Sequence, residues 1–175
     1  ACFGSSGCHN AVVASADLVS DLENLLEKAD LLTFLRSSLG ERLKLHHQLR
    51  LTIADCPNSC SQPQIKDIGI IGQAELICDP NECNGCGECE VVCEESAIVL
   101  DDGFLLSIDE ELCVQCGACA RICPSSAIDI SANTYKILVG GKLGRHPQLA
   151  RELIGSLDGD QVLDLVGEIA DFFKA

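Results

Sequence analysis

Apolar residues recur at helical spacing near both ends of the chain. Between residues 10 and 29 the apolar positions form one stripe, with the acidic side chains largely off it; this stripe consists of Val12, Val13, Ala16, Val19, Leu22, Leu25 and Leu26. Recurrence about every three to four residues predicts an amphipathic helix over 10–29, with Asn10 as its N-terminal cap. Similar patterns predict helices over 31–39, 147–156 and 160–173.

Three other segments have the alternating pattern of β-strands. They are residues 47–54, 65–77 and 135–139, and Gly69 and Gly72 interrupt the second of them. A cysteine-rich segment separates the last two strands. This order predicts an α+β fold in which a smaller module interrupts a larger domain. The predicted parts are residues 1–77, the module at 78–130, and a return strand with C-terminal helices at 131–175.

The cysteine-rich segment contains an internal repeat of the run Cys-x2-Cys-x2-Cys-x3-Cys. The first copy is Cys83, Cys86, Cys89 and Cys93, and the second, thirty positions later, is Cys113, Cys116, Cys119 and Cys123. In two-cluster ferredoxins the fourth cysteine of each such run binds the other cluster. The spacing therefore predicts two 4Fe–4S clusters, one held by Cys83, Cys86, Cys89 and Cys123, the other by Cys113, Cys116, Cys119 and Cys93. The module resembles bacterial-type ferredoxins over residues 78–130.

The alternative interpretation of these cysteines is zinc. Zinc sites favour paired Cys-x2-Cys knuckles that are well separated in sequence, which fits two tandem four-cysteine runs poorly. Cys78 lies outside the repeat, and we expect it to be a small buried apolar residue rather than a ligand.

Composition and charge narrow the class of partner. Residues 67–120 contain thirteen Asp or Glu and no Lys or Arg, so they account for most of the net charge of −15. This distribution argues against nucleic acid and favours a redox partner with a basic surface. The chain has thirteen cysteines, twelve of them in candidate metal-ligand sets, which indicates a reducing, cytoplasmic compartment. No apolar run approaches the roughly 18 residues that a membrane span requires.

Four more cysteines form a second set, Cys2-x5-Cys8 and Cys56-x3-Cys60. The predicted helix and strand between the two pairs would bring them together around a third cluster. Cys8 would then stand at the start of the first helix, where the positive end of the helix dipole stabilises a thiolate. Spacing alone leaves three alternatives open for this set: a third 4Fe–4S cluster, zinc, or free thiols.

Cys-x5-Cys followed by Cys-x3-Cys resembles the cluster signature of the sirohaem-dependent sulfite and nitrite reductases. The Cys-Pro-Asn-Ser-Cys loop at 56–60 and the inserted ferredoxin module are similar to the dissimilatory and anaerobic sulfite reductases. The resemblance implies that Cys2, Cys8, Cys56 and Cys60 bind a cluster, and that Cys60 also bridges to sirohaem iron. Lys142 and Arg145 lie in a glycine-rich turn. They would either contact haem carboxylates or phosphate-like anions, or carry solvated charges where a strand ends. Arg36, Arg42, Lys44 and Arg50 form a looser basic group that would face an anionic cofactor or solvent.

Two functional hypotheses follow. In the first, the chain is the iron–sulfur part of a sirohaem-type sulfite or nitrite reductase, passing electrons from the ferredoxin clusters to the haem-coupled cluster. In the family, the Cys-x5-Cys pair lies behind a large N-terminal region that supplies the substrate-binding Arg and Lys residues. The 175-residue sequence lacks that region, so we expect another chain or segment to complete the site. In the second hypothesis, the chain is a polyferredoxin-like electron carrier with neither sirohaem nor a substrate site.

Overall fold

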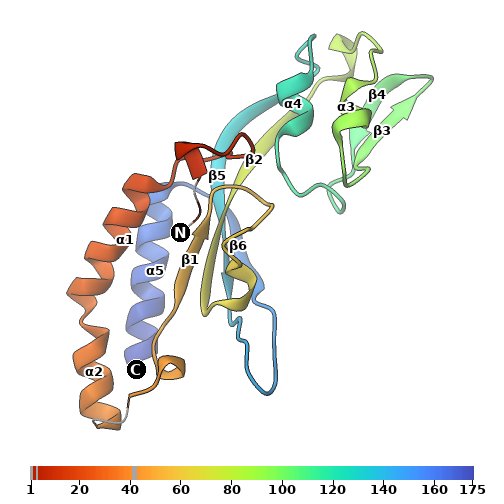
Figure 1. Ribbon diagram of the computed structural model, residues 1–175. Coiled ribbons are helices and arrows are strands. Elements are labelled where there is room, and N and C mark those ends of the chain that lie inside the picture. Colours follow the sequence, from red (N-terminus) through yellow and green to blue (C-terminus); the bar gives the residue numbers. More distant parts are fainter. Residues whose placement is uncertain (1, 3, 41–42) are drawn as a thin grey trace.

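The computed structural model describes residues 2, 4–40 and 43–175 and has the expected α+β fold. A four-stranded sheet carries helices on one face, and a separate arm extends from one end of the sheet (Figure 1). The sheet contains β1 (Leu51–Ala54), β2 (Ile68–Cys78), β5 (Ile128–Val139) and β6 (Arg151–Leu157), and the helices beside it are α1 (Ala16–Ala29), α2 (Leu31–Leu39) and α5 (Gly159–Lys174). The arm, residues 79–127, contains α3 (Glu88–Val92), β3 (Ile98–Asp101), β4 (Phe104–Ile108) and α4 (Ala118–Ile122).

The sheet has the order β1-β2-β5-β6, with β1 parallel to β2 and the other neighbours antiparallel. The β2–β5 ladder runs from Ile68↔Val139 to Cys78↔Ile128, with a shift of register at Glu75/Leu76. Beyond that shift the two strands continue as the stalk of the arm (Figure 1). The arm therefore leaves and rejoins the sheet through neighbouring strands, and the boundary predicted after residue 130 falls inside β5.

The main core lies between the sheet and the helices α1 and α5. Its most deeply buried side chains are aliphatic: Leu22, Ile68, Ile70, Ile137, Val162 and Val166. Each such side chain contributes about 1.5–3 kcal/mol when fully buried. The predicted helices over 31–39 and 160–173 are confirmed as α2 and α5, and α5 begins with a capping box between Asp158 and Gln161. No helix in the described ranges combines the length and apolar character needed to cross a membrane.

The first helix begins six residues later than predicted, at Ala16. The backbone N–H groups of Val12 and Val13 both donate to the carbonyl oxygen of Asp55, at 2.8 and 3.2 Å. These bonds fix the segment against the end of β1, so its N–H groups do not form helical bonds. The N-cap is Ser15, not Asn10, and its hydroxyl bonds the Asp55 carboxylate instead of the helix backbone.

The helix predicted over 147–156 is wrong, because Arg151–Leu157 form the edge strand β6. The sequence there contains good helix formers, but β5 offers an unpaired edge, and pairing from Val139↔Arg151 to Tyr135↔Leu157 satisfies it. Tertiary pairing thus overrides local propensity.

Gly69 and Gly72 do not interrupt β2 but allow close packing on its two faces. A Cβ atom on Gly69 would lie 2.4 Å from the carbonyl oxygen of Pro63. A Cβ atom on Gly72 would lie 2.3 Å from Val13 Cγ2 and 2.9 Å from the Asp55 carbonyl oxygen. Gly72 therefore lies under the junction that holds the N-terminal segment against β1.

We predict that Gly72→Ala lowers the free energy of unfolding by about 1–3 kcal/mol, because the methyl group overpacks this junction. Anaerobic urea unfolding measures the change. Gly144→Ala is the matched control, since nothing lies within 4 Å of its added Cβ, and we expect a change within about 0.5 kcal/mol. Equal unfolding midpoints for the two variants would contradict close packing at Gly72.

Candidate iron–sulfur sites

The fold gathers twelve of the cysteines into three groups of four, each built from two stretches of sequence. We name them the third group (Cys2, Cys8, Cys56 and Cys60), the distal group (Cys83, Cys86, Cys89 and Cys123) and the proximal group (Cys93, Cys113, Cys116 and Cys119). Their membership matches the sets expected from the sequence. Whether each group ligates a cluster remains a prediction.

The third group forms where the N-terminal segment meets the loop after β1. Burial raises the pKa of the Cys56 thiol, and the nearby sulfurs of the other three members raise it further, which places all four close together. The Gly4 N–H donates to Cys2 Sγ at 3.2 Å, and the Asn58 amide donates to Cys60 Sγ at 3.1 Å. Cys56 is buried, Cys2 and Cys8 are half-buried, and Cys60 is exposed, so Cys60 is the most accessible member of the group.

The distal group lines a small cavity inside the arm. Cys83 Sγ accepts hydrogen bonds from the N–H groups of Gly85 and Leu105, at 3.4 and 3.2 Å. Burial tends to raise the pKa of Cys123, but hydrogen bonds led by the Ile128 backbone outweigh it, so the net shift is downward. Cys89, at the N-terminal turn of α3, is buried beside Cys83 and Cys123. The fourth sulfur of the second run therefore lies with the first run.

The proximal group repeats this arrangement with the runs exchanged. Burial raises the pKa of Cys119 to about 11, and nearby sulfurs that include Cys93 contribute. Cys93 Sγ accepts a hydrogen bond from the Ala97 N–H at 3.3 Å. The loop is tied to the sheet because the Ala74 N–H donates to the Gln115 carbonyl at 2.8 Å. The proximal group is thus fixed at the root of the arm.

The surroundings of the sulfurs bear on what each group could hold. Across the described residues, no three or more His, Cys, Asp or Glu side chains converge closely enough to hold a single metal ion. The distal and proximal thiols line cavities, and in all three groups a backbone N–H points at a sulfur. Hydrogen bonds to sulfur are characteristic of the surroundings of iron–sulfur clusters. Glycines with positive φ, Gly87 and Gly117, begin the short helices that carry the third cysteine of each run.

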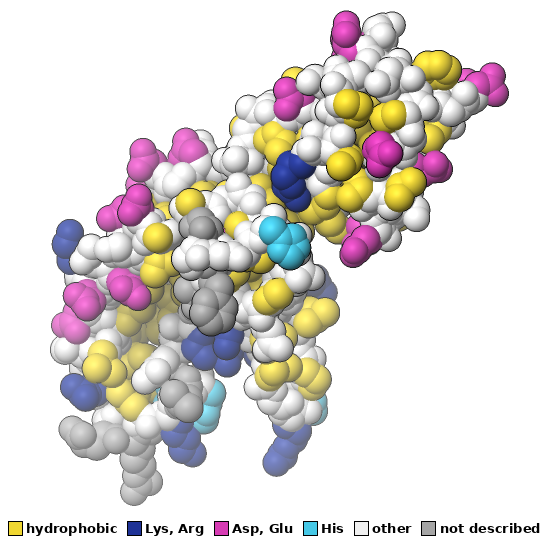
Figure 2. All heavy atoms as spheres, turned by 45° about the horizontal axis from the view of Figure 1, so that its top comes forward, with side chains coloured by type: hydrophobic (Ala, Val, Ile, Leu, Met, Phe, Trp, Pro, Cys, Tyr) yellow, Lys and Arg dark blue, Asp and Glu magenta, His cyan; other side chains and the backbone are white. Residues whose placement is uncertain are grey.

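A cleft of about 520 Å³ connects the proximal group with the third group. It is lined on one side by the four proximal cysteines and on the other by Cys56, Pro57 and Asn58. Arg121 also lines it and is the single Lys or Arg between residues 67 and 135. Figure 2 shows basic side chains mostly at the end of the molecule away from the arm, with a basic side chain also at the junction of the two lobes. The proximal group therefore faces the third group across a short, shared space.

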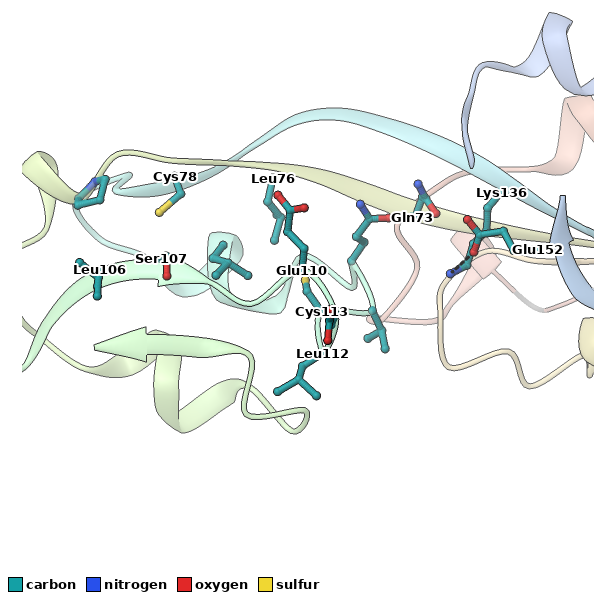
Figure 3. A pocket seen from close by; sticks show the side chains of 15 residues that line it. Gln73, Leu76, Cys78, Leu106, Ser107, Glu110, Leu112, Cys113, Lys136 and Glu152 are labelled. Atoms are coloured by element: carbon teal, nitrogen blue, oxygen red, sulfur yellow. Dashed lines mark ion pairs between the residues drawn. The ribbon is translucent and has the colours of Figure 1, made fainter. Parts of the chain in front are cut away.

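A second cavity, of about 840 Å³, lies at the root of the arm on the sheet face away from the helices (Figure 3). Its wall on the arm includes Glu110, Glu111 and Cys113, and its wall on the sheet includes Lys136 and Glu152. Lys136 is its one basic residue, and Nζ lies 3.5 Å from a Glu152 carboxylate oxygen. The charged residues of this cavity are therefore mainly acidic, with Glu110, Glu111 and Glu152 against one lysine.

Lys142 and Arg145 do not line the cleft that the proximal group shares with Cys56. Both are exposed in the connection between β5 and β6, where the Gly140 N–H bonds the Asp67 carbonyl next to Ile68. The cysteine loop follows Ala54, which pairs with Ile71, so it leaves the other end of the parallel β1–β2 pair.

Three other sequence expectations have clear outcomes. Cys8 precedes α1 by eight positions, so the expected dipole of that helix does not act on its thiol. Cys78 is exposed rather than buried, because the end of β2 extends past the helix-covered core. In the loose basic group, Arg50 forms an ion pair with Asp67 at 2.9 Å, and Arg42 lies outside the described residues.

Sequence reasoning missed two residues of the third group's surroundings. Asp55 is buried, bonds Ser15, and its carbonyl fixes Val12 and Val13. Ser59 is buried in the cysteine loop. In the sequence, Asp55 and Ser59 are marked only by being next to Cys56 and Cys60. That position does not distinguish them from ordinary turn residues.

Comparison with known proteins identifies a matching family and several relatives. The family described as the nitrite and sulphite reductase 4Fe-4S domain matches residues 1–175. A coenzyme F420-dependent sulfite reductase of Methanocaldococcus jannaschii is 37% identical over 145 residues, 83% of this chain and 21% of the relative. A subunit of the anaerobic sulfite reductase of Salmonella typhimurium is 29% identical over 98 residues, 56% of this chain and 24% of the relative.

A solved structure supports the fold. The crystal structure of dissimilatory sulfite reductase I matches with a TM-score of 0.56 and 20% identity, over 99% of this chain and 45% of that chain. The matched region thus spans about a quarter or less of the two curated relatives and less than half of the solved chain.

The crossed membership of the distal and proximal groups can be tested by a double variant. If Cys83 and Cys123 hold one cluster, Cys83→Ala combined with Cys123→Ala removes about four irons per chain, as either change alone does. If each run held its own cluster, the double variant would remove about eight. Iron and acid-labile sulfide assays on anaerobic protein measure the loss, and Cys78→Ala is the control that retains all iron.

Proposed function

The chain belongs to the nitrite and sulphite reductase 4Fe–4S domain family, and we propose that it conducts electrons through three 4Fe–4S clusters to a sirohaem-type sulfite or nitrite reductase site. The distal, proximal and third groups each hold one cluster. Electrons enter at the distal group, cross to the proximal group, and reach the third group. The cleft that the proximal cysteines share with Cys56, Pro57 and Asn58 is the observation that carries this order.

The exposed sulfur of Cys60 suits the last step of this path. Cys60 is the one exposed member of the third group, and the Asn58 amide orients its sulfur. Cys60 would therefore bind cluster iron and present its sulfur to a haem outside this chain. A bound haem would supply the site at which a small sulfur or nitrogen oxyanion is reduced. Lys142 and Arg145, exposed in the connection between β5 and β6, stay candidate anion contacts.

Partner chains complete this function in our proposal. A relative named as one subunit of an anaerobic sulfite reductase supports a multi-subunit setting. The arm is acidic throughout residues 67–120, so its electron donor would present a basic surface. A cytoplasmic setting, which keeps the thiols reduced, belongs to the same proposal.

A carrier without sirohaem is the second candidate. Its support is that Lys142 and Arg145 are exposed and do not line the cleft that the proximal group shares with Cys56. Pigment extraction from the anaerobically purified complex separates the two: a tetrapyrrole supports the reductase, and its absence from active material supports the carrier.

If electrons enter at the distal group, removing the distal cluster should slow reduction of the third cluster by a protein donor but not by a small reductant. We expect Cys86→Ala to slow reduction of the third cluster by a protein donor at least tenfold, because the entry point is lost. Dithionite, a small reductant, should still reduce the third cluster normally. Stopped-flow absorbance with freeze-quench EPR measures both reactions, and Cys78→Ala is the control. Unchanged reduction by the protein donor would contradict entry at the distal group.

A further inference from the structure

Ser59 carries a buried hydroxyl that the protein itself does not satisfy. Its Oγ is the one side-chain oxygen or nitrogen in the described part of the chain that is fully buried with no hydrogen-bond partner. Buried polar groups are almost always hydrogen-bonded, and an unpaired one destabilises the fold. We therefore expect the Ser59 hydroxyl to donate a hydrogen bond to an acceptor that is not part of the polypeptide.

The backbone at Ser59 gives a second reason to look for such an acceptor. Its φ is +55°, in the left-handed region that favours glycine. The main chain needs no side chain for this turn, since the Ser59 N–H donates to the Cys56 carbonyl and the Ser59 carbonyl accepts from Gln62 N–H, at 3.1 and 2.8 Å. A glycine would form the same turn without strain and without an unpaired hydroxyl.

The surroundings of Ser59 point to sulfur. It lies between Cys56 and Cys60 in the loop of the third group, and its neighbour Asn58 already donates to Cys60 Sγ. The same chain places another serine hydroxyl beside a cysteine sulfur, since Ser125 Oγ lies 3.7 Å from Cys123 Sγ in the distal group. Ser61, in the same loop, has an ordinary partner and donates to the Ile53 carbonyl at 2.6 Å.

We propose that the Ser59 hydroxyl donates a hydrogen bond to a sulfur of the third cluster and raises the reduction potential of that cluster. Reduction adds negative charge to the cluster, and a hydrogen bond to sulfur stabilises the reduced form more than the oxidised form. Ser59 is thus a tuning residue that makes the third cluster a better acceptor for the proximal cluster. The inference rests on the proposed function only in that the third group holds a cluster.

Ser59→Ala tests the inference in the full chain. We expect unchanged iron and sulfide content. At a fixed potential, the ratio of reduced to oxidised third cluster should fall about fivefold, which is the effect of losing one ordinary hydrogen bond. An EPR-monitored redox titration measures this ratio. Proton ENDOR of the reduced third cluster, before and after exchange into D2O, should show an exchangeable proton that Ser59→Ala lacks.

Two matched variants separate tuning from folding. Ser59→Gly removes the hydroxyl and the backbone strain together, so it should shift the potential as Ser59→Ala does while unfolding at higher urea. Ser61→Ala removes a hydroxyl that has a protein partner, so it should lower stability and leave the potential unchanged. Three intact clusters with an unaltered potential in Ser59→Ala would overturn the inference alone. About eight irons in the unmodified chain would remove the third cluster, and with it both the inference and the three-cluster path.

Discussion

The antiparallel pairing of β2 with β5 is the constraint on which the arrangement depends. One ladder, from Ile68↔Val139 to Cys78↔Ile128, forms both the centre of the sheet and the stalk of the arm. Its sheet end supports the loop that contains Cys56, because β1 pairs with the same strand. Just before the register shift at Glu75/Leu76, the bond between Ala74 and Gln115 holds the proximal loop on the same ladder. The distance between the third group and the proximal group is therefore set by backbone pairing in the sheet rather than by flexible linkers.

Thiolates that lie close together repel one another, and iron ligation would offset this repulsion. Burial and neighbouring sulfurs raise the pKa of Cys56, Cys89, Cys113 and Cys119, so these groups resist becoming thiolates together. Metal ligation requires the deprotonated sulfur, and the charge of iron compensates the mutual repulsion. Cluster binding and folding of the loops are thus expected to be coupled. The acidic surface of the arm adds to the same local negative charge.

The polar residues around the third group have two different roles. Asp55 is structural, since its carbonyl and carboxylate hold the N-terminal segment that brings Cys2 and Cys8 to the loop. Ser59 has no structural role in the described chain, because its hydroxyl has no partner and its backbone conformation suits glycine better. A serine that destabilises the fold at this position is most simply explained by a role toward the cluster that we propose for the third group.

The sequence by itself determined the features that depend on neighbouring residues. Helices α2 and α5 follow from local periodicity, and the two cysteine runs carry their crossed grouping in their spacing. Only the tertiary structure decided the features that depend on distant partners. Residues 10–15 are not helical because the Asp55 carbonyl binds them, and Arg151–Leu157 form a strand because β5 has an open edge. Likewise, the exposure of Cys78 depends on where the helix-covered core ends, which no local pattern encodes.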